Sequence, residues 1–174
     1  MSKVITGKVR FSYAHVFEPA AISEGAEKKY SVSILIDKKD KVTLKKIEDA
    51  IKEATENGKS KLGDKKVANL KNPLRDGDLE RDDDENYAGK MFINANSFTK
   101  PGLVDQDLNP ILDRDEFYSG CYGRASLNFY AYNANGNKGI ACGLGNIQKL
   151  EDGTRLSGGS TAQEDFGSEE DDLG

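Results

Sequence analysis

Alternation of apolar and polar residues with a period of two is the feature of this chain that most constrains its fold. It runs through residues 4–13, 29–36, 90–100 and 120–133. Successive side chains of a β-strand point to opposite faces, so this period predicts strands with one buried face. A fifth strand is expected at about 138–150, after a tight turn at Asn135-Gly136-Asn137.

The alternation also predicts which side chains face the core of the protein. In the first two strands these are Ile5, Val9, Phe11, Tyr13, Tyr30, Val32, Ile34 and Ile36. In the next two they are Met91, Ile93, Ala95, Cys121, Ala125, Leu127, Phe129 and Ala131.

One segment has a helical period instead. Leu44, Ile47, Ile51 and Ala54 recur at steps of three and four residues and predict an amphipathic helix at about 40–57. Asp40 can cap its start, and Asn57-Gly58 favours a left-handed stop. The remaining segments predict a loop or bulged extension at 14–28, a polar excursion at 58–89 with a helical turn near 66–70, and a short hairpin at 103–112.

These elements together predict a mainly β protein with an OB-fold-like (oligonucleotide/oligosaccharide-binding) small barrel. Its one helix follows the second strand, and closure of the barrel hides strand edges that an open sheet would expose. We expect one domain over 1–156 and a flexible acidic tail over 157–174, because Ser-Gly-Gly-Ser-Thr separates the last strand from a segment with almost nothing apolar to bury.

The net charge of −5 is concentrated in two places. Without the last eleven residues the chain has 25 basic and 24 acidic residues. Without residues 76–85 as well, it has 24 basic and 17 acidic residues. Most of the barrel is therefore basic, which is compatible with an anionic ligand.

The outward faces of two strands have an unusual composition. They read Lys90, Phe92, Asn94, Asn96, Phe98 and Lys100 on one strand, and Tyr122, Arg124, Ser126, Asn128, Tyr130 and Tyr132 on the other. Lys8 and Arg10 add cations on the first strand, and none of these positions is acidic. Aromatic rings along a basic groove bind unpaired bases through their flat faces, so the pattern predicts single-stranded-nucleic-acid binding, DNA or RNA.

A structural interpretation of the same aromatics stays open. Phe92 and Phe98 could pack beneath the helix or the long loop, and Tyr132 could belong to a dimer contact. Taken singly, each ring fits a structural role better; taken together, they favour binding.

The tail has a second predicted role. Its acids and its one aromatic residue are Glu164, Asp165, Phe166, Glu169, Glu170, Asp171 and Asp172. A tethered anion beside a basic groove competes with DNA for the same cations and becomes available to other proteins when DNA binds. A purely solubilising role is the alternative.

An enzyme and a structural or decoration protein of a virion are the other two classes considered. Asp82-Asp83-Asp84-Glu85 and the group Asp113, Asp115 and Glu116 could hold Mg²⁺ for nuclease chemistry. Runs of carboxylates in polar loops are more often solvated, His15 is the single histidine, and no nucleotide-binding or nucleophile motif occurs. We therefore expect no catalytic residue, no metal and no cofactor.

The compartment is expected to be the cytoplasm, with no membrane association. No stretch approaches the roughly 20 apolar residues that span a bilayer, and Lys3 and Lys8 interrupt any signal-type segment. Cys121 and Cys142 each lie in a predicted strand and are expected to be reduced core residues rather than a disulfide.

Three short motifs resemble a family of phage-encoded single-stranded-DNA-binding proteins with an OB-fold. They are Asn72-Pro73-Leu74-Arg75-Asp76-Gly77-Asp78, Phe117-Tyr118-Ser119-Gly120-Cys121 and Gly136-Asn137-Lys138-Gly139-Ile140-Ala141. Their order and spacing, within a likeness that covers most of Val4 to Leu150, make the resemblance specific.

This resemblance implies sequence-tolerant binding of single-stranded DNA in phage replication or recombination, often by a homodimer. Within and beside the motifs, Arg75, Tyr118, Tyr122 and Arg124 are the preferred candidates for DNA contact, and an anchoring role of Arg75 through Asp76 or Asp78 is equally compatible. The tail resembles those that recruit replication proteins, yet it ends Asp171-Asp172-Leu173-Gly174, whereas such tails commonly end in an aromatic residue.

Overall fold

The computed structural model describes residues 2–21, 24–63 and 70–156. The main strands are β1 (Ser2–Ile5), β2 (Val9–Ala20), β3 (Lys29–Asp37), β5 (Lys90–Ser97), β7 (Tyr122–Ala134) and β8 (Asn137–Glu151), and two short strands are β4 (Arg75–Asp76) and β6 (Leu103–Val104). The helices are α1 (Lys41–Asn57), α2 (Lys59–Leu62), α3 (Gly77–Glu80) and the 3-10 turn η2 (Glu85–Tyr87).

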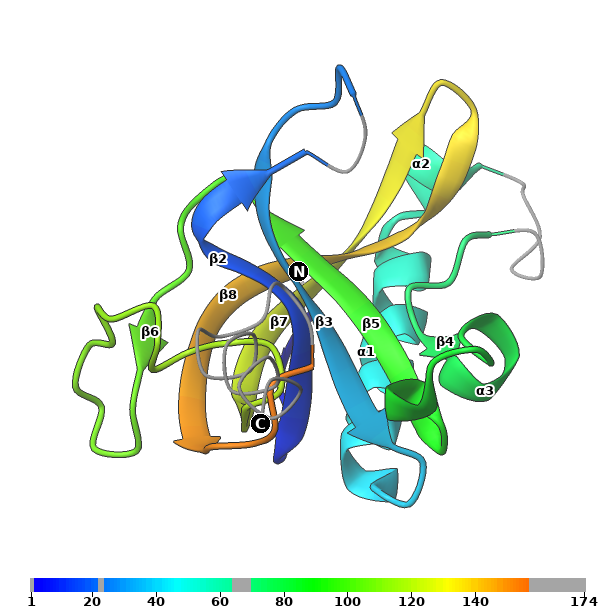
Figure 1. The fold of residues 1–174 in the computed structure, drawn as a ribbon. Coiled ribbons are helices and arrows are strands. Elements are labelled where there is room, and N and C mark those ends of the chain that lie inside the picture. The colour runs from blue at the N-terminus through cyan, green and yellow to red at the C-terminus, as the bar shows by residue number, and fades with distance from the viewer. Residues whose placement is uncertain (1, 22–23, 64–69, 157–174) are drawn as a thin grey trace, which may run out of the picture.

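Five strands form a ring in the order β2-β3-β5-β8-β7, with β7 pairing back onto β2 (Figure 1). The pairs β2–β3, β3–β5 and β7–β8 are long and antiparallel. Two narrower contacts complete the ring: Val9 and Arg10 pair with Gly123 and Tyr122, and Asn96 pairs with Gly143 in parallel. The ring is mainly β and OB-fold-like, with narrow closing contacts and a helix after its second strand, which confirms the predicted fold class for the part of the chain that the structure describes.

Helix α1 covers the inner face of β1 and β7, where its apolar stripe of Leu44, Ile47, Ala50 and Ala54 is buried. The Asp40 carboxylate accepts a hydrogen bond from the amide of Thr43, as expected for the cap. Gly58 ends the helix with φ −99°, so the expected left-handed stop is wrong. A Cβ at this position would lie 2.2 Å from the Cβ of Ala131, so close packing of the helix end on β7 requires the glycine.

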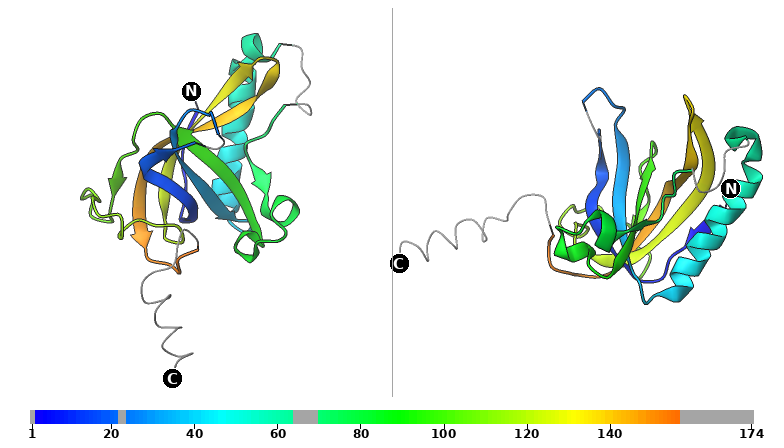
Figure 2. Two further views of the ribbon diagram at one scale, coloured as in Figure 1. Left: turned by 45° about the horizontal axis from the view of Figure 1, so that its top comes forward. Right: turned by 90° about the vertical axis from the view of Figure 1, so that its right-hand side faces the viewer.

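Two hairpin arms extend from the same end of the barrel (Figure 2). One is formed by β2 and β3, and the other by β7 and β8. Asn135 and Gly136 have φ values of +53° and +89°, as a two-residue turn between twisted strands demands. The last described residues lie at the opposite end of the barrel (Figure 1).

The predicted first strand is divided in the structure. Residues 6–8 leave the sheet, and Tyr13, with φ +47°, marks a bulge that shifts the register of β2 against β3. The expected inward positions of Ile5 and Tyr13 are therefore wrong, because these side chains are 45% and 51% exposed. Beyond the bulge β2 continues to Ala20, which confirms the bulged extension.

Phe92 is a second correction. It faces outward from β5 as the alternation predicts, but it is 0% exposed because Tyr87 packs on it with ring centroids 5.1 Å apart. Residues 70–89 cover it, and Tyr87 from this segment forms a second small core with Leu35 and Phe92. Phe92 is therefore a core residue rather than a surface residue that can contact DNA, whereas Phe98 is 64% exposed.

Several smaller predictions can be compared directly. Val104 bridges to Pro110, which confirms a short hairpin in 103–112, and Cys121 and Cys142 are free and buried. The helical turn expected near 66–70 and the tail from residue 157 lie outside the described residues, apart from Leu70. Among the described helices, none is long and apolar enough to cross a membrane.

The different environments of Phe92 and Phe98 predict different costs of truncation. Phe92→Ala should lower the free energy of unfolding by about 3–5 kcal/mol, because it empties a packed site. Phe98→Ala, the matched control, should cost less than about 1 kcal/mol. Chemical denaturation followed by circular dichroism measures both, and equal costs for the two variants would contradict the covered position of Phe92.

Candidate nucleic-acid interface

The floor of the candidate site is the outer face of β3 and β5 between the two arms. Ser31 lies opposite Asn96, and Ser33 lies opposite Asn94, so polar side chains alternate with the core residues beneath them. The buried Ser33 hydroxyl is hydrogen-bonded to the Tyr87 hydroxyl at 3.1 Å. Oligonucleotide-binding barrels use this face and the flanking arms for their ligands.

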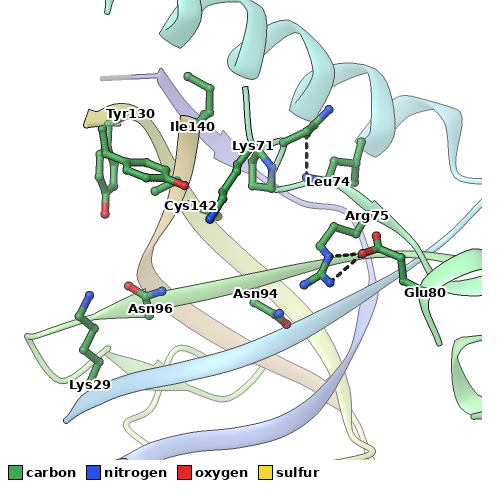
Figure 3. A pocket seen from close by; sticks show the side chains of 14 residues that line it. Lys29, Lys71, Leu74, Arg75, Glu80, Asn94, Asn96, Tyr130, Ile140 and Cys142 are labelled. Atoms are coloured by element: carbon green, nitrogen blue, oxygen red, sulfur yellow. Dashed lines mark hydrogen bonds and ion pairs between the residues drawn. The ribbon is translucent and has the colours of Figure 1, made fainter. Parts of the chain in front are cut away.

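A cavity of about 870 Å³ adjoins this floor. Its walls are Asn94 and Asn96 from β5, Tyr130 and Tyr132 from β7, and the segment 71–75, with Lys29 at its rim (Figure 3). Gly139 is in contact with this segment: a Cβ there would lie 2.8 Å from the Lys71 Cβ. Two of the three family-like motifs therefore meet at this cavity.

The tyrosines of β7 lie beside a row of small residues on β8. Tyr132 is paired with Gly139, Tyr130 with Ala141 and Asn128 with Gly143. A Cβ on Gly143 would lie 3.5 Å from Cε1 of Tyr130, so the ring rests directly over the glycine. Burial raises the pKa of the Tyr130 phenol above its ordinary value.

Two smaller cavities continue the floor toward the other arm. One, of about 340 Å³, shares Asn94 and Asn96 and adds Tyr13, His15 and Arg81. The other, of about 270 Å³, lies between Lys29 and Phe98. We call the three adjoining cavities the groove.

Positive charge predominates along the groove. Arg75 is paired with Glu80 at 2.7 Å, whereas Lys29, Lys71 and Arg81 form no ion pair with a described residue. The Arg81 guanidinium lies 5.4 Å from the Phe92 ring centroid, and its buried Nε has no hydrogen-bond partner among the described residues. A guanidinium without an ion-pair partner among the described residues is suited to phosphate binding.

The motif around Arg75 is largely structural. Lys38 forms ion pairs with Asp76 at 2.8 Å and Asp78 at 2.6 Å, and its ammonium group lowers the pKa of both carboxyl groups. Gly77 packs so closely that a Cβ would lie 2.4 Å from the Tyr87 carbonyl oxygen. The anchoring partner of Arg75 is Glu80, and neither Asp76 nor Asp78.

The structure brings some predicted residues together and separates others. Arg75, Tyr130, Tyr132 and Phe98 line the groove. Lys8, Arg10, Tyr122 and Arg124 cluster at the opposite end of β7, outside the groove. Lys100 lies near the Phe17 ring, also outside the three cavities.

Tyr118 also lies outside the groove, where its contacts are structural. Its hydroxyl donates to the Gly153 carbonyl at 2.9 Å, and the Arg155 guanidinium lies 4.5 Å from its ring centroid. These contacts hold residues 152–155 against the end of the barrel.

Sequence reasoning missed Tyr13, Lys29, Lys71, Arg81, Asn94 and Asn96 as site candidates. Lys71 precedes the Asn72-Pro73 motif, which was the one available signal for it. Tyr13 was assigned to the core because the bulge of β2 is not visible in the alternation. Asn94 and Asn96 were placed on the outward face correctly, but they were not selected.

The fold and the groove define an OB-type barrel with an aromatic and basic face. The family described as the ssDNA-binding protein of Enterobacter phage Enc34 matches residues 2–173, and the chain belongs to this family. Putative protein p50 of Acyrthosiphon pisum secondary endosymbiont phage 1 is 32% identical over 170 residues, covering 92% of this chain and 89% of that protein.

Solved structures agree with the fold. The single-stranded DNA-binding protein of bacteriophage Enc34 in complex with ssDNA has a TM-score of 0.79 at 24% identity, covering 90% of each chain. The single-stranded DNA binding protein gp2.5 of bacteriophage T7 has a TM-score of 0.62 at 13% identity, covering 92% of this chain and 98% of that one.

Proposed function

We propose that this protein binds single-stranded DNA in the groove between its two arms, without reading a particular sequence. The observation that carries the proposal is the convergence of Tyr130, Tyr132 and cations that form no ion pair with a described residue on the polar face of β3 and β5. Membership of a single-stranded-DNA-binding family supports the same conclusion.

Two kinds of contact would hold the strand. Each base that stacks on an aromatic ring contributes about 1–3 kcal/mol, whichever base it is. Lys29, Lys71 and Arg81 neutralise phosphates and release the counterions condensed on them, so binding weakens as salt rises. Asn94 and Asn96 can bond to base edges without requiring one base, because their amide groups both donate and accept.

The groove should discriminate strongly between single strands and duplex, because paired bases cannot present their faces to Tyr130. Fluorescence anisotropy with labelled oligo-dT and a duplex of equal length should give much tighter binding of the single strand at two salt concentrations. Equal affinity for both would contradict stacking. A matched RNA strand in the same titration shows whether the sugar matters, which stacking alone does not decide.

Removal of one ring tests the groove itself. Tyr130→Ala should weaken oligo-dT binding about 5- to 150-fold, the equivalent of one lost stacking contact. Tyr130→Phe, the matched control, keeps the ring and should bind nearly as the wild type does. Because Tyr130 is 37% exposed, the melting temperature should change little in either variant. A large fall in melting temperature with unchanged DNA affinity would show that the ring is structural.

The acidic tail is proposed to compete with DNA. Its 18 residues can reach about 60 Å when extended, which is enough to pass from one end of the barrel to the groove. A chain ending at Leu156 should therefore bind oligo-dT severalfold more tightly, and more so at low salt than at high salt. A full-length chain with the six tail acids changed to Asn and Gln should bind like the truncated one. Unchanged affinity for oligo-dT in both variants would contradict competition and indicate a solubilising tail.

A catalytic role is not part of the proposal. The acids considered for a metal site have local structural roles: Asp113 accepts from the amide of Asp115, and Asp84 accepts from the amide of Asn86. Among the residues that the structure describes, no group of three or more His, Cys, Asp or Glu is placed to hold a metal ion. A host-cell cytoplasmic location, homodimer formation and recruitment of replication or recombination proteins by the tail stay predictions.

A further inference from the structure

A second basic and aromatic surface lies at the end of β7 that is remote from the arms. Lys8, Arg10, Tyr122 and Arg124 form it, and we call it the Arg124 patch. Two cations lie near the Tyr122 ring, with Lys8 Nζ at 5.4 Å and the Arg10 guanidinium at 5.3 Å from its centroid. Arg10 and Tyr122 are paired across β2 and β7, so their side chains share the outer face.

Both arginines of the patch are positioned by backbone carbonyl groups rather than by acids. Arg10 donates to the carbonyls of Gly120 at 3.0 Å and Thr154 at 2.9 Å. Arg124 donates from Nε to the Thr6 carbonyl at 3.2 Å, and its two Nη groups form no hydrogen bond with a described residue. Because a carbonyl does not neutralise a guanidinium, both charges remain available to an anion.

A continuous row of side chains connects the patch with the groove. The outward positions of β7 run from Tyr122 and Arg124 through Ser126 and Asn128 to Tyr130 and Tyr132, and none is acidic. At about 3.3 Å per residue, Arg124 and Tyr130 are roughly 20 Å apart along the strand. The neighbouring strand β1 places Lys3 opposite Asn128 on the same face, and Lys3 is exposed.

Among the described residues, the acid opposite Tyr122 on the neighbouring strand is already paired. Glu151, which lies opposite Tyr122 on β8, forms an ion pair with Lys8. Arg10 and Arg124 therefore give the patch a surplus of positive charge at the end of a polar row. Rings and cations at both ends of one row fit a flexible anionic chain with flat bases better than a rigid protein surface.

We propose that single-stranded DNA extends beyond the groove, along the outer row of β7, to the Arg124 patch. The inference rests on the proposed function of the groove and adds a second contact region for the same strand. A short oligonucleotide occupies the groove alone, whereas a longer one also reaches Arg10, Arg124 and the Tyr122 ring.

The test compares oligo-dT of about 6 and about 16 nucleotides, which span the site sizes of OB-folds. In the full-length protein, Arg124→Glu should leave the affinity for the shorter strand within about twofold of wild type. The reason is that about 20 Å exceeds the Debye length of about 8 Å at 0.15 M salt. For the longer strand, the affinity of the same variant should fall about tenfold. The slope of its salt dependence should decrease by the amount expected for one to two lost phosphate contacts.

Lys46→Glu provides the matched control, because Lys46 is exposed on α1 and the substitution changes the net charge equally. Tyr122→Ala should also weaken only the longer strand. The inference is overturned if Arg124→Glu matches Lys46→Glu on the longer strand, or if it weakens both strands equally. Absence of wild-type binding to either strand would instead refute the proposed function of the groove.

Discussion

The arrangement of the site depends on the narrow contact that joins β5 to β8. Asn96 and Gly143 are the parallel pair that connects the two halves of the ring. This contact places the polar face of β5 directly beside the arm that carries Tyr130. The Tyr130 ring lies over Gly143 of this pair, at a distance where an added Cβ would be in van der Waals contact with Cε1 (3.5 Å), so the closing contact adjoins the aromatic wall of the groove. The groove is thus a consequence of how the barrel closes.

The chain also separates structural charges from charges available to a ligand. Lys38, Asp76 and Asp78 fix the excursion that covers Phe92, and Arg75 is held by Glu80. Lys29, Lys71 and Arg81 have no such partner among the described residues. The protein therefore combines an acidic overall composition with a basic groove, which is the distribution expected of a single-strand binder of the Enc34 family.

Most strands and the main helix could be predicted from the sequence, because short-range periodicity of the apolar residues determines them. The inward residues of β7 and the start of α1 at Asp40 follow from the period of the apolar residues and from capping. The course of β2 could not be predicted in this way. The bulge at Tyr13 exchanges the inward and outward positions of the strand, and no change in composition marks it. Phe92 shows a further limit: alternation gives the direction of a side chain, but not whether a distant segment covers it.

The types of residue in the candidate site could be predicted from the sequence, but their positions relative to one another could not. The sequence predicts an acid-free outward row on β7, and the structure places that row on one face of the strand. Only the folded chain shows that Tyr130 and Tyr122 lie at opposite ends of the barrel. Lys71 and Arg81 come from the polar excursion, whose place beside the groove depends on long-range contacts with β5 and β8. Local patterns carry no information about such contacts.

Unpaired bases that stack in the groove must lie on its tyrosines. Photocrosslinking of a short oligonucleotide that carries a photoreactive pyrimidine, followed by peptide mapping, can detect this contact. We expect crosslinks at Tyr130, Tyr132 or Tyr13, and their loss when unlabelled oligo-dT competes. Crosslinks confined to residues outside the groove, with none on these three rings, would contradict it.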